Sequence, residues 1–274
     1  MGTAFNACNA CADPSLHRRI RHGYTAFTMD NAHVIRDSME AVAALRAKAA
    51  AQPALGEAVA AVKRLQATRF RHCYSDLMES RDFGPASHFF LKELYGEADY
   101  AQRDQQFARI AGTLATVFPA SVVSTAVALS QLHVLTEELD HVMASYCVQH
   151  AISVSNLDAA SYVAAWHFVG RRADRQQQLV NVIALGRDLA VLTTKPGLAL
   201  LLKLMRRPAA SAGLGSLQQF LERGFAIFAA LSRSKGKVNG FLTTIESRES
   251  AWLKDMFENP ADKAAIALAQ LLNK

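Results

Sequence analysis

The segment 82–104 carries the feature that most constrains the fold, a dense set of helix start and stop signals. Pro85 suits the first turn of a helix, where a missing N–H costs nothing. Gly96 stands where a left-handed residue would close that helix. An aspartate and a glutamine three residues apart then have the spacing of a capping box. The segment therefore predicts two helices, 85–95 and 99–118, joined by a tight turn.

Helical periodicity continues along most of the chain, and prolines and glycines separate the periodic stretches. Strand signals are nearly absent, because the chain has few alternating β-branched runs and no Asn-Gly or Asp-Gly hairpin. We expect an all-α protein, a single globular bundle of about eight to ten helices. Further helices are predicted at 30–51, 54–80, 120–149, 157–193 with a break near Gly170, 197–207, 214–233, 240–257 and from Pro260 onward.

Composition places the chain among globular proteins. It has 274 residues, of which 51% are hydrophobic and 20% charged, so it can bury a large core. No apolar run reaches the ~18–20 residues that cross a bilayer, and the N-terminus has no apolar signal region. Four cysteines in a chain of this length do not form a disulfide framework. A cytoplasmic protein is expected.

The N-terminal residues differ in character from the rest. Residues 1–28 have no apolar period and contain a basic cluster at 17–22, so we expect a flexible basic arm followed by an all-helical domain over 29–274. Cys8 and Cys11 have zinc-like spacing, but no second Cys-x-x-Cys pair accompanies them. We interpret them as incidental. The net charge of +6 is compatible with acidic partners but too diffuse to identify one.

Arg103 is predicted to point inward. It falls on the apolar stripe of the 99–118 helix, one turn before Phe107. A guanidinium is not buried alone, so it either pairs with a carboxylate or extends its head to water. Asp76 or Asp140 is the expected partner. Aromatic side chains form the predicted wall of a pocket near this pair: Tyr74, Phe89, Phe90 and Tyr95.

Histidines and carboxylates at helical spacing allow a second hypothesis, a metal site between two helices. Such sites in helical bundles need several carboxylates and histidines from different helices. Both candidate stripes lie opposite an apolar face, which instead predicts solvated surfaces. The candidate ligands are His72, Asp76 and Glu79 on one helix and His133, Glu137 and His141 on another.

Two other cofactor or partner hypotheses rest on single helices. His167 stands beside Tyr162 and Trp166, an aromatic setting in which a histidine can ligate haem. A histidine on an aromatic helix is more often a core residue. For nucleic acid, Gln105, Gln106 and Arg109 follow a helix–turn–helix outline and are residue types that read bases. We favour an ordinary solvated face for them. These three residues and the basic arm are the candidates for contact with nucleic acid.

The segment 198–207 is almost entirely apolar, with cations toward its C-terminal end. It could lie on a membrane or on a partner. It also fits a buried helix whose last turn is complemented by Lys203, Arg206 and Arg207. We favour the buried helix.

Several motifs resemble those of a family of uncharacterised helical proteins from proteobacteria. The motifs are the run 89–96, Arg103 with Asp104, Leu139 with Asp140, and the run 220–225. The likeness covers roughly residues 60–250 and leaves the arm outside. It implies a soluble all-helical domain, and because the family has no assigned activity it implies no catalytic residue.

These patterns together favour a non-catalytic binding or assembly protein. The expected partner is another protein or a small apolar ligand, and a homodimer is possible. A metal- or haem-dependent helical oxidase and a nucleic-acid-binding regulator are the alternatives.

Overall fold

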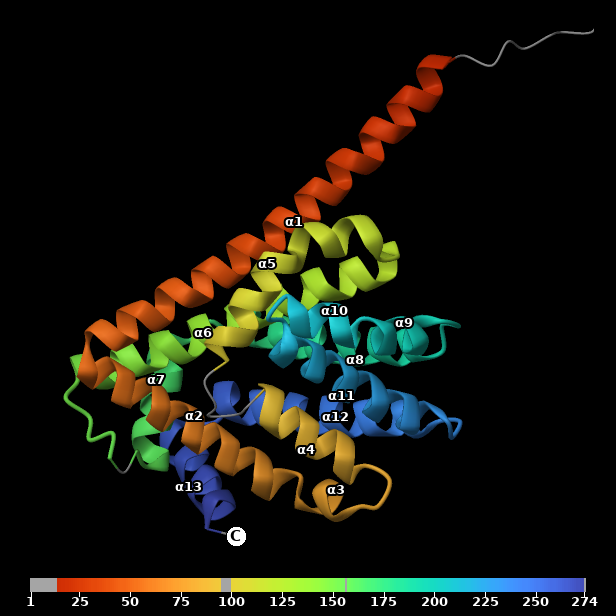
Figure 1. Cartoon of the computed structure of the whole chain (residues 1–274). Helices are drawn as coiled ribbons and strands as arrows, with labels where there is room; N and C mark the ends of the chain where they lie inside the picture. The colour runs from red at the N-terminus through yellow and green to blue at the C-terminus, as the bar shows by residue number, and fades with distance from the viewer. Residues whose placement is uncertain (1–13, 95–99, 156, 274) are drawn as a thin grey trace, which may run out of the picture.

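The computed structural model describes residues 14–94, 100–155 and 157–273, with side chains from residue 30 onward except that of Leu94. Within these ranges the chain forms thirteen α-helices and no β-strand. Figure 1 shows a bundle from which the N-terminal part of α1 projects. The helices are α1 (Pro14–Ala51), α2 (Pro53–Cys73), α3 (Ser75–Glu79), α4 (Gly84–Leu94), α5 (Ala101–Val117), α6 (Ala120–Gln149), α7 (Ala159–Val169), α8 (Arg172–Thr193), α9 (Leu198–Leu204), α10 (Arg206–Ser211), α11 (Gly215–Ser232), α12 (Lys237–Glu258) and α13 (Ala261–Leu272).

The predicted all-α class is confirmed, although the number of helices exceeds the predicted range. Two predicted helices are each divided in the structure. The 54–80 helix breaks at Tyr74, between α2 and α3. The 197–207 helix ends at Leu204 because Pro208, in the next turn, has no N–H to donate to the Leu204 carbonyl. The first helix begins at Pro14, earlier than the predicted residue 30.

Helix α6 is the centre of the bundle. It contacts α1, α2, α5, α7 and α8, so neighbours cover it on several sides. Buried residues fall on several sides of its second half, among them Glu137, Leu139 and Asp140. Polar side chains on its second half therefore lie between helices.

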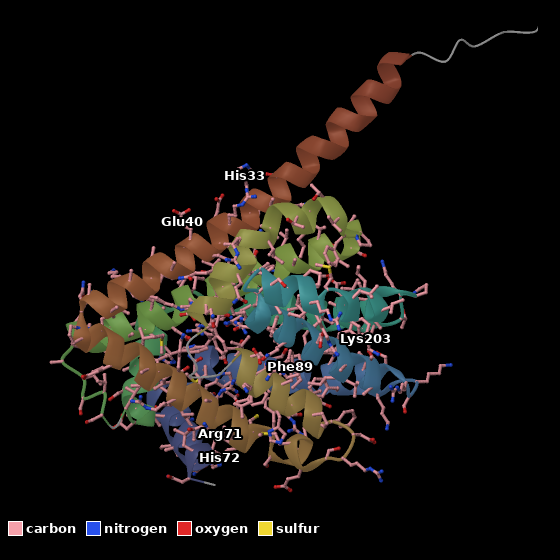
Figure 2. All side chains as sticks on the ribbon, viewed as in Figure 1. His33, Glu40, Arg71, His72, Phe89 and Lys203 are labelled. Atoms are coloured by element: carbon pink, nitrogen blue, oxygen red, sulfur yellow. The ribbon has the colours of Figure 1, made fainter. Side chains whose placement is uncertain are left out.

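The part of α1 beyond residue 30 packs through one face. Ala32, Ile35 and Met39 recur at helical spacing and are buried against α5 and α6. His33 and Glu40 lie on the outer face and point away from the bundle (Figure 2). This amphipathic pattern fixes which side of α1 faces the core.

The core consists of three groups of buried apolar side chains. One joins α2, α6, α7, α12 and α13 around Tyr162 and Met256. A second joins α2, α4, α8, α11 and α12 around Phe70, Phe228 and Phe241. The third joins α1, α5, α6 and α11. The functional candidates described below lie where these groups meet.

The turn between α7 and α8 confirms the predicted break near Gly170. Gly170 has a φ of 62°, which glycine adopts without steric cost. Arg171 follows with a φ of 51°, a left-handed conformation that costs a non-glycine residue about 1 kcal/mol. The turn aligns α7 and α8 beside α6.

At the other end of α7, Asp158 caps the helix by accepting a hydrogen bond of 2.8 Å from the Ser161 amide.

Among the described residues, no helix combines the length and the apolar character needed to cross a membrane.

Candidate functional site

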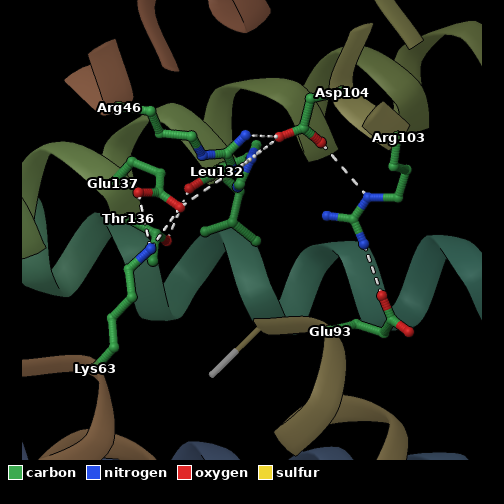
Figure 3. Close-up of polar contacts among 9 residues, drawn as sticks. Arg46, Lys63, Glu93, Arg103, Asp104, Leu132, Thr136 and Glu137 are labelled. Carbon is green, nitrogen blue, oxygen red and sulfur yellow. Dashed lines mark hydrogen bonds and ion pairs between the residues drawn. The ribbon is translucent and has the colours of Figure 1, made fainter. Parts of the chain in front are cut away.

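A network of ion pairs joins α6 to four other helices (Figure 3). Its members carry opposite charges in equal number apart from one histidine, and each carboxylate has a cationic partner. We call it the ion-pair network. Its residues are Arg46 of α1, Lys63 of α2, Glu93 of α4, Arg103 and Asp104 of α5, and His133 and Glu137 of α6.

Asp104 is the junction of this network. Its carboxylate is buried and lies 2.8 Å from both His133 Nε2 and Arg46 Nη1. Burial alone would raise the pKa of Asp104. The hydrogen bond from His133 and the charges of Arg103 and Arg46 outweigh that effect and lower the pKa. Asp104 is therefore held as an anion.

Glu137 is held in the same way by α2. Lys63 Nζ donates to both carboxylate oxygens, at 2.8 and 2.9 Å. Burial would raise the pKa of Glu137, but the charge of Lys63 and its hydrogen bond lower it. The prediction that the stripe of His133, Glu137 and His141 is solvated is wrong, because α1 and α2 cover this face of α6.

Arg103 is paired internally, as one of the two sequence interpretations held, but not with the expected carboxylates. Its Nη1 atom lies 2.6 Å from Glu93 Oε2. The guanidinium also lies over the rings of Tyr100 and Phe220, at 4.1 and 4.7 Å from their centroids. Asp76, the first expected partner, is exposed and binds Arg248.

Asp140, the other expected partner, lies one helical turn beyond Glu137. It is buried, and Gln66 Nε2 donates to its Oδ1 atom at 2.9 Å. Burial raises the pKa of Asp140, against the opposing charges of Lys63 and Arg175. Gln66 also lines the cavity described below, next to a second polar group.

That second group is centred on Glu249 of α12. Arg69 donates to its two carboxylate oxygens, at 3.0 and 2.9 Å, a bidentate pair with little access to water. The hydroxyl of Tyr74 donates to Oε1 at 2.8 Å. Tyr74 stands at the break between α2 and α3 and is fully buried. Arg69 precedes His72 by three residues on the stripe that was expected to be solvated, yet it is buried, so that expectation is wrong at Arg69.

A cavity of about 60 Å³ lies next to this group, where α2, α6, α7, α8 and α12 meet. Both tryptophans of the sequence line it, with their ring centroids 6.3 Å apart. Each ring carries a guanidinium on its face. Arg175 lies 4.2 Å from the Trp166 centroid, and Arg69 lies 4.9 Å from that of Trp252. We call this the tryptophan cavity.

Trp166 is almost completely buried, with 4% of its surface exposed. Its Nε1–H has no acceptor among the described residues. A buried donor without an acceptor costs roughly 1–3 kcal/mol, so an indole N–H in this state is unusual. An oxygen atom bound in the cavity beside Trp166 would satisfy this donor.

The predicted pocket residues are only partly brought together. Phe90 lines the tryptophan cavity, and Tyr74 contacts Glu249 in its wall. Phe89, labelled in Figure 2, is half-buried and packs on Phe220 without lining the cavity. Tyr95 lies outside the described residues.

The two predicted metal stripes do not converge. Asp76 and Glu79 are exposed beyond the break at Tyr74, and His72 lies near the edge of the molecule (Figure 2). Glu137 and His133 are engaged in the ion-pair network. Within the described ranges, no group of three histidine, cysteine or acidic side chains is arranged to hold a metal ion. The two sets of predicted ligands are separated because α2 and α6 direct these stripes toward different neighbouring helices.

The remaining sequence candidates have other partners. His167 Nε2 lies 2.7 Å from the Met256 carbonyl, which explains its position without haem. Gln106 is buried and accepts from the Leu217 amide at 2.9 Å, so the predicted base-reading face is wrong at this residue. Arg109 donates to two carbonyl groups after α10, and Gln105 is exposed. Cys8 and Cys11 lie outside the described residues.

Comparison with known families gives one match. A family model described as Domain of unknown function (DUF8198) matches residues 45–263. The chain belongs to this family. No curated protein and no solved structure matches the chain. The match confirms the resemblance to an uncharacterised helical family, and the matched residues include the whole ion-pair network and the tryptophan cavity.

Sequence reasoning missed most of the tryptophan cavity. It named Trp166 and Tyr162 only as neighbours of a histidine, and it gave no role to Arg175, Glu249 or Trp252. The one available signal was that the chain has only two tryptophans, each on a helix that also carries polar residues. Their convergence depends on the packing of α7 against α12, which local periodicity does not encode.

Proposed function

We propose that this DUF8198 chain is a binding protein whose site is the tryptophan cavity, and that its ligand is a small carboxylate. The observation that carries the proposal is the buried Trp166 Nε1–H, which has no acceptor in the described part of the chain and lies beside a cavity lined by two guanidinium groups. A carboxylate oxygen in the cavity would supply that acceptor, and charge-assisted bonds to a guanidinium are among the strongest available.

The size of the cavity limits the ligand. A water molecule needs roughly 10–15 Å³ of such volume, so a cavity of about 60 Å³ holds only a few non-hydrogen atoms. Acetate and propionate are of this size. Apolar walls from Leu132, Val182 and Ile245 favour a short alkyl chain beside the charged end.

The surroundings favour binding over the metal-dependent alternative. Glu249 is already satisfied by Arg69 and Tyr74, and the acidic residues of the ion-pair network are held by cations. These contacts preorganise the cavity walls and so reduce the entropy lost on binding.

Tryptophan fluorescence tests the proposal directly, because both tryptophans line the site. The protein is titrated with sodium propionate against sodium chloride at equal ionic strength. A saturable change with propionate alone is expected, and Arg175→Gln is expected to weaken it by about tenfold or more. Arg172→Gln, an exposed arginine on the same helix, is the matched control and leaves it unchanged.

A second measurement guards against a folding defect. Trp166→Phe keeps an aromatic ring, although a smaller one, and removes the N–H, so calorimetry with propionate should show weakened binding while circular dichroism shows an intact helical fold. A wild-type protein that gives no saturable response to acetate or propionate contradicts the proposal.

A further inference from the structure

Helix α9 lies at the end of the bundle with an unusual exposure. Its sequence is Leu-Ala-Leu-Leu-Leu-Lys-Leu, yet none of its seven residues is buried. The prediction of a buried helix over 198–207 is therefore wrong. Leu200 and Leu204 are 59% and 65% exposed, and the adjoining Val191 at the end of α8 is 58% exposed. Such adjacent exposure of large apolar side chains marks an interaction surface rather than a core.

Cations surround these apolar side chains. Within α9, Lys203 and Leu204 lie three and four residues after Leu200, so these three exposed side chains share one outward stripe. Arg207 follows in α10 and is exposed as well. No aspartate or glutamate occurs in the sequence between Asp188 and Glu222. The stripe is thus apolar and positive along its length.

The turn between α11 and α12 extends the positive charge. Thr193 Oγ1 lies 3.4 Å from Ser232 Oγ, which places the end of α8 beside the end of α11. Figure 1 shows the turns that follow these two helices at the same end of the bundle. Arg233 and Lys235 are exposed on that second turn. None of Lys203, Arg207, Arg233 and Lys235 forms an ion pair with a described carboxylate.

We propose that this end of the molecule, formed by Val191, Leu200, Lys203, Leu204, Arg207, Arg233 and Lys235, docks on an anionic lipid surface. We call it the α9 surface. Exposed leucines beside lysine and arginine form the pattern with which interfacial helices enter the headgroup region, and each added cation strengthens attraction to anionic lipid.

The positive charge of the α9 surface favours an anionic lipid over a second copy of the chain as its partner. A two-fold dimer through the α9 surface would bring the same cations face to face, because such an interface pairs a patch with itself. Like charges in contact oppose that association. An anionic bilayer instead neutralises the cations and accepts the leucine side chains. This inference is independent of the tryptophan cavity.

Vesicle flotation with the full chain tests the inference. Phosphatidylcholine vesicles with and without phosphatidylglycerol are compared at low and high salt. Binding to the anionic vesicles alone, weakened by salt, is expected. The double change Lys203→Gln with Arg207→Gln is expected to reduce binding about tenfold or more. Leu200→Ser with Leu204→Ser should reduce it similarly and leave the fold intact, because both side chains are exposed.

Helix α13 supplies the matched control. It carries an exposed lysine and isoleucine three residues apart, and Ile266 is 58% exposed. The change Lys263→Gln with Ile266→Ser removes one cation and one apolar group far from α9 and should leave flotation unchanged. The inference is overturned by equal flotation with neutral vesicles, by no flotation, or by an equal loss in the α13 control. Light scattering that shows the Leu200→Ser, Leu204→Ser change dissociating a dimer would also overturn it, in favour of self-association.

Discussion

Arg103 and Glu93 form an ion pair of 2.6 Å between α5 and α4, with the guanidinium enclosed by two aromatic rings. Removing one partner of a buried pair leaves the other charge without compensation. We expect Arg103→Ala to lower the free energy of unfolding by about 3 kcal/mol. Urea unfolding followed by circular dichroism measures this change.

The control for this prediction is Arg64→Ala, which removes an exposed arginine from the surface of α2. Surface changes of this kind stay within about 0.5 kcal/mol. An effect of Arg103→Ala as small as that of the control would show that the pair contributes nothing beyond its surface charge.

Glu249 connects α12 to α2 through Arg69 and Tyr74. The change Glu249→Ala leaves the buried Arg69 guanidinium without its bidentate carboxylate, and we expect a loss of about 3–5 kcal/mol. Tyr74→Phe removes one hydrogen bond to the same carboxylate and should cost about 1 kcal/mol. Thermal melts of the two variants rank them, and a Tyr74→Phe effect as large as that of Glu249→Ala would contradict this account.

Asp104 and Asp140 should respond to pH in opposite directions. The folded-state pKa of Asp104 is lowered, so its contribution is complete above the unfolded pKa of about 3.9 and is lost as pH falls through the folded value. Asp104→Asn should therefore be less stable than wild type at neutral pH, by a margin that shrinks in acid.

The folded-state pKa of Asp140 is raised, so its contribution is complete below the unfolded pKa and is lost as pH rises through the folded value. Asp140→Asn cannot ionise, and its amide oxygen can still accept from Gln66. The variant should gain stability relative to wild type as pH rises from about 4 to neutrality. Unfolding curves across this range measure both variants, and parallel pH profiles would count against the assignment.

The fold class follows from local signals, but the site does not. Pro85 near the start of α4 and the left-handed Gly170 after α7 mark helix boundaries that the sequence shows directly. The break at Tyr74 has no glycine or proline, and the Tyr74 hydroxyl donates to a carboxylate 175 residues away. Sequence signals next to Tyr74 cannot show a contact with a residue so far along the chain.

Predicted faces failed for a related reason. A polar stripe opposite an apolar stripe is interpreted as solvated, and that holds for helices at the edge of a bundle. Helix α6 is central, so its polar stripe meets Arg46 of α1 and Lys63 of α2 instead of water. The apolar α9 shows the reverse error, because its composition resembled a core helix while its position is peripheral.

Two glycines test how closely the helices approach. A Cβ atom on Gly186 of α8 would lie 2.6 Å from Leu242 Cδ2 of α12, so Gly186→Ala must displace a fully packed leucine. We expect a loss of about 1–3 kcal/mol, as for overpacking in a core. Gly240 of α12 has no atom within 4 Å of the same position, so Gly240→Ala should instead stabilise the helix by about 0.5–1 kcal/mol. Urea unfolding of both variants measures these changes. Equal gains in stability would mean that α8 and α12 are less tightly packed than the Gly186–Leu242 contact requires.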